Sequence, residues 1–209
     1  MSRKPVIVFE GIEGSGKSYH LKKVSDYFKK KKIRFIKIRE PGGSVNSEKI
    51  RKLILDKKSE FDKYTDLLLY LAARNENINK YKKFYKKRII LIDRFTDSTI
   101  SYQHFGLGVN LDLIKKINDF ILKDFKPDFT FLNTVSLKNM KNRLKTRKFL
   151  NRYDKFNSNF YDKVQKGFLK IVKKNKKKYT IINSNLDINH NKDLIIGITR
   201  KLIWSNSNQ

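Results

Sequence analysis

Short apolar runs alternate with longer amphipathic stretches along this chain of 209 residues. The runs are rich in β-branched and aromatic residues, a composition that favours strands, and they cover residues 6–9, 33–38, 88–93, 129–132 and 179–182. Between them, apolar residues recur at helical spacing over residues 19–31, 46–57, 63–86, 111–124, 136–147, 158–177 and 191–204. This alternation predicts an α/β fold, with a five-stranded parallel sheet, helices on both faces and a ligand site at the carboxyl ends of the strands.

The length of the chain fits one domain. No internal repeat and no interdomain linker interrupts the pattern, so residues 1–209 are expected to fold as a single unit. Hydrophobic residues make up 39% of the chain. That content supplies enough apolar surface to offset the entropy cost of folding, which excludes a disordered protein.

The charge of the chain raises a second possibility. Basic residues outnumber acidic ones by 49 to 20, which gives a formal net charge of +29. Such an excess is typical of proteins whose cations neutralise nucleic-acid phosphates. Here, however, 38 of the basic residues are Lys, spread over nearly every predicted helix, and only 11 are Arg. A diffuse Lys coat favours solvated faces, so we predict no specific nucleic-acid partner and keep a basic nucleic-acid-binding protein as the alternative class.

Other residue types exclude several kinds of site. The chain has no Cys and three scattered His, which excludes disulfides, thiolate nucleophiles and a zinc cluster. No apolar run approaches the roughly 20 residues that span a bilayer. The N-terminus leads directly into the first predicted strand, without the apolar core of a signal peptide. We therefore expect a cytoplasmic protein with no membrane partner.

A phosphate-binding motif follows the first predicted strand and precedes a predicted helix, which is the context that this motif requires. Residues 11–18 match G-x-x-x-x-G-K-[ST] without a gap, as Gly11, Ile12, Glu13, Gly14, Ser15, Gly16, Lys17 and Ser18. The glycines let backbone N–H groups wrap a triphosphate, Lys17 reaches the β- and γ-phosphate oxygens, and the Ser18 hydroxyl ligates Mg²⁺. The sequence therefore predicts a fold of the P-loop NTPase type that binds ATP or GTP.

The third predicted strand ends in Asp93, beside the phosphate-binding loop in the predicted sheet. A carboxylate at this position is suited to support a Mg²⁺ ion together with Ser18. The alternative is an exposed strand-end acid without a ligand. We favour the magnesium role because of the neighbouring loop.

Further motifs follow in a fixed order along the chain. They are residues 9–18, Arg39-Glu40-Pro41-Gly42-Gly43, residues 67–74, Asp93-Arg94-Phe95 with Ser98, Tyr102-Gln103, Pro127-Asp128 and the basic stretch 143–154. This ordered set resembles the thymidylate kinase family of P-loop nucleoside monophosphate kinases, and within it the bacterial branch. The resemblance implies in-line phosphoryl transfer from Mg·ATP to dTMP, giving dTDP for dTTP biosynthesis.

The resemblance also implies the residues that hold the acceptor phosphate. Arg39 and Arg94 resemble the pair that binds it, and Pro41 belongs to the same dTMP site. Glu13, whose charge would repel a phosphate, resembles the residue that receives a sugar hydroxyl of the acceptor or helps to orient the metal. Because the acceptor is already an anion, no strong general base is needed, so Lys17 and the arginines are the expected catalytic groups.

The base and sugar of the acceptor have their own implied contacts. Tyr70 resembles the aromatic residue on which thymine stacks, although its leucine neighbours also allow a core aromatic. Arg74, one helical turn further on, resembles the donor to a base oxygen. Ser98 and Gln103 are lesser candidates for base or phosphate contacts. Tyr102 resembles the residue that packs under the sugar and disfavours a 2′-hydroxyl.

A small helical lid is expected over approximately residues 143–157. The phosphate-binding loop has Gly14 where some family members carry an arginine, which resembles the members whose lid supplies that charge. Arg143 and Arg147 are four apart and are expected on one helical face, with Arg152 in a loop after them. We rank Arg147 and Arg152 above Arg143, which could equally anchor the helix against a donor phosphate.

The chain departs from the usual family pattern at His104, Leu107 and Asn151, which affects the loop after Tyr102 and the contacts around the lid. Family members commonly pair, so a homodimer is expected. Within the same class, a P-loop kinase of another nucleotide or of a nucleoside is the alternative function.

Overall fold

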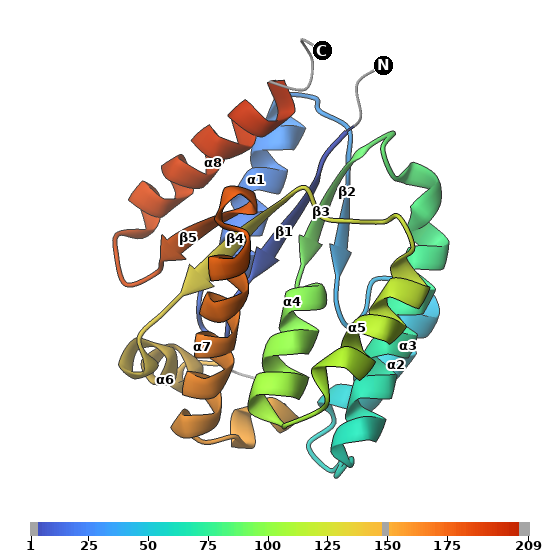
Figure 1. Ribbon diagram of the computed structural model, residues 1–209. Helices are drawn as coiled ribbons and strands as arrows, with labels where there is room; N and C mark the ends of the chain where they lie inside the picture. The colour runs from blue at the N-terminus through green and yellow to red at the C-terminus, as the bar shows by residue number, and fades with distance from the viewer. Residues whose placement is uncertain (1–3, 148–150, 205–209) are drawn as a thin grey trace.

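The computed structural model of the chain describes residues 4–147 and 151–204. Its strands are β1 (Val6–Glu10), β2 (Phe35–Arg39), β3 (Ile89–Asp93), β4 (Phe129–Thr134) and β5 (Tyr179–Asn183). All of them pair in parallel, in the order β2-β3-β1-β4-β5 (Figure 1). The predicted sheet is confirmed, and each strand lies within two residues of its predicted bounds.

The central strand β1 contributes side chains to two separate cores. Ile7 and Phe9 belong to the cluster beneath α1 (Lys17–Lys30) and α8 (Ile188–Trp204). Val6 and Val8 belong to the cluster on the opposite face of the sheet. Because such a strand is buried on both faces, it is a continuous apolar run and not an alternating one.

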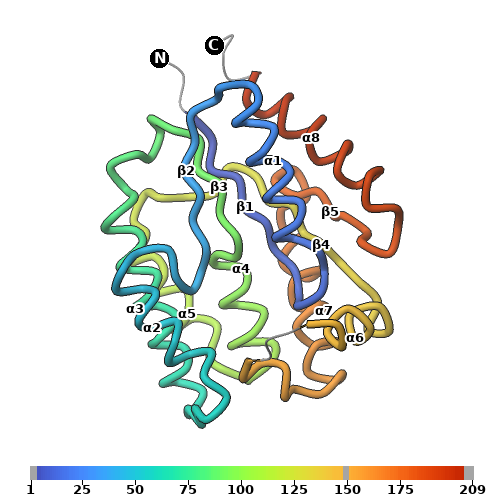
Figure 2. The backbone as a smooth tube through the Cα atoms, turned by 180° about the vertical axis from the view of Figure 1, so that it is seen from behind, coloured from blue at the N-terminus to red at the C-terminus, as the bar shows by residue number. Residues whose placement is uncertain are grey.

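Helices cover both faces of the sheet, as predicted. Figure 2 shows α1 and α8 side by side in front of the strands, and α4 and α7 lie on the other side in Figure 1. The remaining described helices are α2 (Val45–Leu55), α3 (Lys63–Tyr81), α4 (Thr96–Thr99), α5 (Leu111–Leu122), α6 (Leu137–Lys145) and α7 (Ser158–Lys174). Short helical turns are η1 (Lys82–Phe84), η2 (Ile100–Gly106), η3 (Arg152–Lys155) and η4 (Lys176–Lys178).

The segment from α4 to η2 was not predicted to be helical. It continues from α4 as a π-helix, in which the amide of Leu107 donates to the carbonyl of Tyr102, five residues earlier, at 3.0 Å. A π-helix has a wider turn than an α-helix, so its apolar residues do not repeat at the spacing that signals a helix.

The helix before the expected lid ends earlier than predicted. α6 stops at Lys145, where the Thr146 hydroxyl donates to the carbonyl of Arg143 at 3.0 Å. The expectation that Arg143 and Arg147 share one helical face is therefore wrong, because Arg147 lies beyond the helix. Residues 148–150 of the expected lid lie outside the described residues. Within the described ranges, no helix combines the length and apolar character needed to cross a membrane.

Candidate functional site

A cavity of about 400 Å³ is lined by residues at and after the ends of β1, β2 and β3, together with residues of α2, α3 and the segment that follows α6. Most of the predicted site residues line it, namely Glu13, Gly14, Gly16, Lys17, Ser18, Arg39, Pro41, Tyr70, Arg74, Asp93, Arg94, Ser98, Tyr102, Gln103 and Arg147. Five predicted residues are outside the described lining, namely Gly11, Ile12, Ser15, Arg143 and Arg152. The site thus lies where a parallel sheet of this kind binds ligands.

The phosphate-binding loop, residues 11–18, joins β1 to α1. Gly11 has a φ of 140°, and a Cβ atom there would lie 2.3 Å from the carbonyl oxygen of Asn133, so only glycine fits. The helix begins at Lys17, whose buried Nζ donates to the carbonyl of Ile12 at 3.4 Å. Burial, with the Arg94 charge second, lowers the pKa of Lys17 to about 8. An anion in the cavity would therefore strengthen the charged form of Lys17.

The two predicted metal ligands are in contact. The Ser18 hydroxyl donates to Asp93 Oδ2 at 2.6 Å, and the buried Oδ1 of Asp93 has no hydrogen-bond partner among the described residues. Mg²⁺ is usually held by one or two protein oxygens together with substrate phosphates and water. These two side chains fit such an ion.

Arg94 follows β3 and contacts both the phosphate-binding loop and Tyr102. Its φ of 66° is unusual for a residue other than glycine. Its guanidinium donates to Glu13 Oε1 at 2.8 Å and to the carbonyl of Gly11 at 2.9 Å, and it lies over the Tyr102 ring, 5.1 Å from the centroid. Glu13 also accepts the Tyr102 hydroxyl. Although burial opposes it, the charges of Arg94 and Lys17 lower the pKa of Glu13, so this carboxylate is ionised.

Two more guanidinium groups face the same cavity. Arg39 Nη2 donates to Glu48 Oε1 at 2.7 Å, and Arg51 Nη1 donates to the carbonyl of Pro41 at 2.6 Å. Together with Arg94 they bring three cations to the cavity. Sequence reasoning missed Arg51, because a basic residue in an amphipathic helix is typical of a solvated face.

Arg74 is nearly sealed inside the protein, with 2% of its surface exposed. Its Nε and Nη2 atoms lie 2.8 and 2.7 Å from Glu40 Oε2, and Nη1 donates to Asn118 Oδ1 at 2.6 Å. A guanidinium has five N–H groups, so two remain for a ligand in the cavity. Its role toward a base stays a prediction.

Aromatic and amide side chains complete the wall around Tyr70. The Tyr153 ring lies 6.3 Å from that of Tyr70, at an angle of 73°. Gln103 Nε2 donates to Asp66 Oδ2 at 3.0 Å, and the Ser98 hydroxyl donates to Glu10 Oε2 at 2.5 Å. The Ser98 hydroxyl hydrogen is therefore already engaged.

The three predicted lid arginines have separate partners. Arg143 donates to the carbonyls of Gly14 and Ser184 at 2.8 and 2.6 Å, which ties α6 to the phosphate-binding loop. Arg147 lines the cavity and pairs with Asp154 at 3.4 Å. Arg152 pairs with the buried Asp66. Only Arg147 of the three belongs to the described cavity lining.

Buried acids are the functional class that sequence reasoning missed. Glu10, at the end of β1, accepts the amide of Phe95 at 2.7 Å, and burial, with the Asp97 charge second, raises its pKa to about 7. Glu40 and Asp66 hold the arginines described above. Glu10 and Glu40 stand within the sequence motifs, but no local signal reveals their roles or that of Asp66, because their partners are distant in the sequence.

Comparison with known proteins places this geometry in a family. A sequence model described as thymidylate kinase matches residues 9–195. A thymidylate kinase of Mycoplasma capricolum is 39% identical over 187 residues, which cover 87% of this chain and 88% of the relative. One of Ligilactobacillus salivarius is 35% identical over 205 residues, covering 94% and 96%. The crystal structure of thymidylate kinase from Ehrlichia chaffeensis matches with a TM-score of 0.76 at 32% identity, covering 95% of this chain and 99% of that one.

Proposed function

The chain belongs to the thymidylate kinase family, which phosphorylates dTMP to dTDP with ATP as the phosphoryl donor. We propose which residues of the chain bind the donor, the acceptor phosphate and the base in this reaction. The observation that carries this proposal is a cavity that unites the phosphate-binding loop, Asp93 and the guanidinium groups of five arginines, Arg39, Arg51, Arg74, Arg94 and Arg147. Transfer between two phosphates has little covalent chemistry for the protein to perform, so catalysis rests on positioning and charge neutralisation.

The donor phosphates occupy the phosphate-binding loop. Residues 11–16 and the N-terminus of α1 supply backbone N–H groups, and Lys17 neutralises the β- and γ-phosphate oxygens. Asp93 and Ser18 would hold Mg²⁺, which would neutralise charge that develops on the phosphates during transfer. Arg143 fixes the loop from the side of α6.

The acceptor phosphate lies against Arg39, Arg51 and Arg94. Planar guanidinium groups bind phosphate oxygens in a bidentate manner, so they fix the attacking oxygen in line with the donor. Glu13 keeps Arg94 oriented and, with Tyr102, lies where the sugar of the acceptor would be. The alternative role of Glu13, orienting the metal, is less consistent with its bond to Arg94.

The base of the acceptor lies beside Tyr70 and Arg74. Stacking on the tyrosine supplies contact area, and the N–H groups of the arginine that Glu40 and Asn118 do not occupy can donate to a carbonyl oxygen of thymine. Cytosine presents an amino group at the corresponding edge, which would place one donor against another. Arg147 faces the cavity from the described first part of the lid and is the arginine that we assign to the transferring phosphoryl group.

We also propose that the chain forms a homodimer through α2, α3 and α5, which lie together on one side of the molecule (Figures 1 and 2). Large apolar side chains are exposed on these helices, namely Val45, Leu53, Leu68, Leu113 and Phe120. Exposed apolar surface of this kind is typical of an interface. Light scattering of the wild type and of Phe120→Glu would test the proposal, and a monomeric wild type would contradict it.

Release of ADP with a panel of acceptors tests the function directly. The expected order is dTMP above dCMP by about ten- to a hundredfold in kcat/KM, since a lost buried hydrogen bond costs about 1–3 kcal/mol. Thymidine tests the nucleoside alternative, and salt-dependent DNA binding without ADP release would favour the nucleic-acid class. The control Lys17→Ala should reduce kcat by several orders of magnitude. A fully active Lys17→Ala protein would contradict the assignment of the donor site.

A further inference from the structure

Asp66 is a buried carboxylate that the proposed transfer does not use. It lies in the first turn of α3 and is 1% exposed. Its Oδ1 atom accepts the guanidinium of Arg152, and its Oδ2 atom accepts Gln103 Nε2 at 3.0 Å and the Tyr153 hydroxyl at 3.1 Å. One carboxylate therefore joins α3 to two other parts of the chain.

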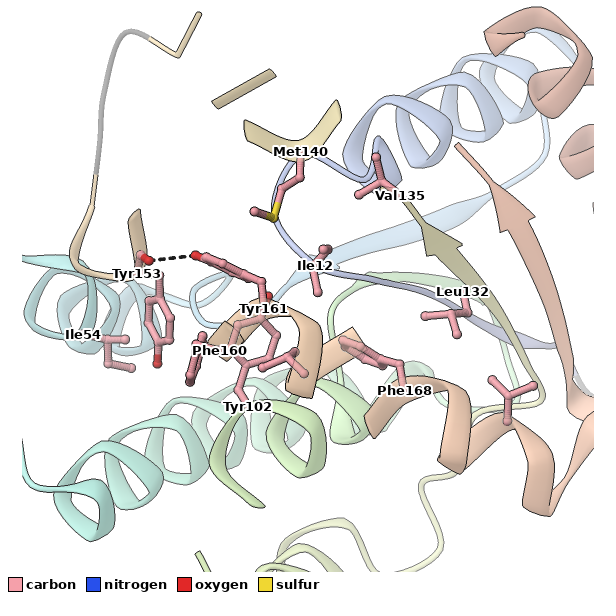
Figure 3. Packing of buried hydrophobic residues seen from close by; sticks show 12 residues of the cluster. Ile12, Ile54, Tyr102, Leu132, Val135, Met140, Tyr153, Phe160, Tyr161 and Phe168 are labelled. Carbon is pink, nitrogen blue, oxygen red and sulfur yellow. Dashed lines mark hydrogen bonds between the residues drawn. The ribbon is translucent and has the colours of Figure 1, made fainter. Parts of the chain in front are cut away.

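The first of these parts is the η3 segment, residues 151–157. The Arg152 guanidinium lies 5.2 Å from the centroids of both the Phe61 and Tyr153 rings, and Arg152 is not part of the described cavity lining. Figure 3 shows Tyr153 beside Ile54, with its carbonyl accepting the Tyr161 hydroxyl, at 2.7 Å. Contacts with Ile54 and Tyr161 thus hold Tyr153 in the η3 segment, whereas Asp66 holds the guanidinium of Arg152.

The second part is the acceptor side of the cavity. Gln103 and Tyr153 both line it, and Tyr70, one helical turn after Asp66, lines it from α3. Of the three side chains around the expected base, Gln103 and Tyr153 donate hydrogen bonds to Asp66, and Tyr70 lies on the same helix as Asp66. Loss of the hydrogen bonds to Asp66 would release Gln103 and Tyr153 together.

We propose that Asp66 is a positioning residue of the acceptor site, which fixes Gln103 and the η3 segment in one arrangement through its shared carboxylate. The inference rests on the proposed function, because it takes the cavity to be the dTMP site. It also assigns Arg152 to this anchor and not to the transferring phosphoryl group, where sequence reasoning had placed it.

The charges and hydrogen bonds of Asp66 make its role dependent on Arg152. An ionised carboxylate without its cation is costly at a buried position, so Asp66 and Arg152 depend on each other. Each acceptor bond of Asp66 goes to a donor on a different residue, so a neutral amide at this position cannot satisfy all three without rearrangement. The two side chains should therefore act as one unit in kinetics.

A double-mutant cycle of Asp66→Asn and Arg152→Ala tests this unit by steady-state kinetics. Each single variant should raise KM for dTMP by about tenfold or more, with a smaller change in kcat, because the side chains that Asp66 positions bind the acceptor equally in the ground state and in the transition state. The double variant should be no worse than the more affected single variant. A product of the two single effects would overturn the proposal. So would an Arg152→Ala variant that loses about a hundredfold in kcat at unchanged KM, since that is the signature of an arginine on the phosphoryl group.

Hydrogen exchange of substrate-free protein tests the anchor without turnover. Asp66→Asn should speed exchange of amides in the η3 segment by about fivefold or more, relative to peptides from β1 and α8 in the same sample. The matched control is Asp62→Asn, four residues earlier, which removes the same charge from an exposed position and keeps a side chain suited to cap α3.

The outcomes separate the two proposals. If the wild type fails to phosphorylate dTMP but the exchange result holds, the proposed function is wrong and the anchor stands. If the wild type is active and Asp66→Asn exchanges like Asp62→Asn, the anchor is overturned. Should Asp66→Asn fail to fold, Arg152→Lys keeps the charge but loses the planar fork, and it should show the same shifts at smaller size. Wild-type kinetics and exchange in Arg152→Lys and Arg152→Ala would contradict the proposal.

Discussion

Replacing Arg74 by Met removes a buried charge and leaves its partner in place. Glu40 would be deprived of the two guanidinium nitrogens that lie 2.7 and 2.8 Å from its Oε2 atom, and Asn118 of its donor at 2.6 Å. The cation over the Phe95 ring would also disappear. Breaking a buried ion pair from one side costs about 3–5 kcal/mol, because the remaining charge stays buried and unpaired. Since domains are stable by about 5–15 kcal/mol, Arg74→Met should fold but unfold at much lower urea concentration.

The destabilisation should depend on pH. Burial raises the pKa of Glu40 and Arg74 lowers it, so removal of Arg74 raises this pKa further. A carboxyl group whose pKa is raised in the folded state costs stability as pH rises through that pKa, so the variant should be less destabilised at pH 5 than at pH 8. Urea unfolding followed by circular dichroism at both pH values measures this.

Adding Glu40→Gln to the variant removes the unpaired charge and should restore most of the stability at pH 8. A destabilisation below about 1 kcal/mol, or an equal one at both pH values, would refute the reasoning about the pair. The stability cost also governs how the base-reading role is tested. Arg74→Ala should narrow the preference for dTMP over dCMP, and this must be measured where the variant is folded.

Three further predictions concern separate features. Arg147→Ala should lower kcat by about a hundredfold or more while dTMP affinity without ATP stays within a few-fold, and wild-type turnover at saturating substrates would contradict it. Because the pKa of Glu10 is raised to about 7, the free energy of unfolding of the wild type should fall between about pH 5 and pH 7 by up to about 1.4 kcal/mol per pH unit. In Glu10→Gln, urea unfolding at a series of pH values should show a smaller decrease over the same range, and an equal decrease would contradict the role of Glu10. A Cβ on Gly167 would lie 2.5 Å from the Phe105 ring, so Gly167→Ala should cost about 1–3 kcal/mol in urea unfolding. The control Gly197→Ala, in α8 with nothing within 4 Å, should gain about 0.5–1 kcal/mol.

The parts of the fold that could be predicted from sequence are those set by local pattern. β1 and β3 are buried from end to end, which makes each a continuous apolar run, and the phosphate-binding loop is contiguous in sequence. The π-helix over residues 100–106 could not be predicted, because its hydrogen bonds change the spacing of its apolar positions. The end of α6 was also missed, because Thr146, and not the usual glycine, ends this helix.

The candidate site divides in the same way. Arg39, Tyr70 and Arg94 carry family motifs, and the structure brings them into one cavity. The partners that hold the site were not predictable, because they come from distant segments. Arg74 meets Glu40, 34 residues earlier, and Asn118, 44 residues later. Residue type and spacing identify groups that contact a ligand, whereas supporting contacts depend on the tertiary fold.

The large net charge and the charge of the site have different origins. Each of five predicted site arginines forms an ion pair with a carboxylate, as Arg39–Glu48, Arg74–Glu40, Arg94–Glu13, Arg147–Asp154 and Arg152–Asp66. Without these partners, guanidinium groups gathered in and beside one cavity would repel one another and lose hydration, so the acids both neutralise and orient them. The described ion pairs of Lys lie mostly at exposed positions, where such pairs contribute little.

Exposure distinguishes two pairs among these arginines. The side chains of Arg39 and Arg147 are 47% and 42% exposed, so a phosphate can reach both guanidinium groups. Glu48, the partner of Arg39, is itself partly exposed, whereas Asp154, the partner of Arg147, is 7% exposed and keeps the amide of Asn151 as a donor when Arg147 leaves. Arg74 and Arg152 are 2% and 12% exposed, and Glu40 and Asp66, which hold them, are buried as well. Separating these pairs would leave a buried charge, so they keep their partners throughout the reaction. Arg39 and Arg147 are thus placed to exchange a carboxylate for a phosphate, while Arg74 and Arg152 hold the shape of the site in which that exchange occurs.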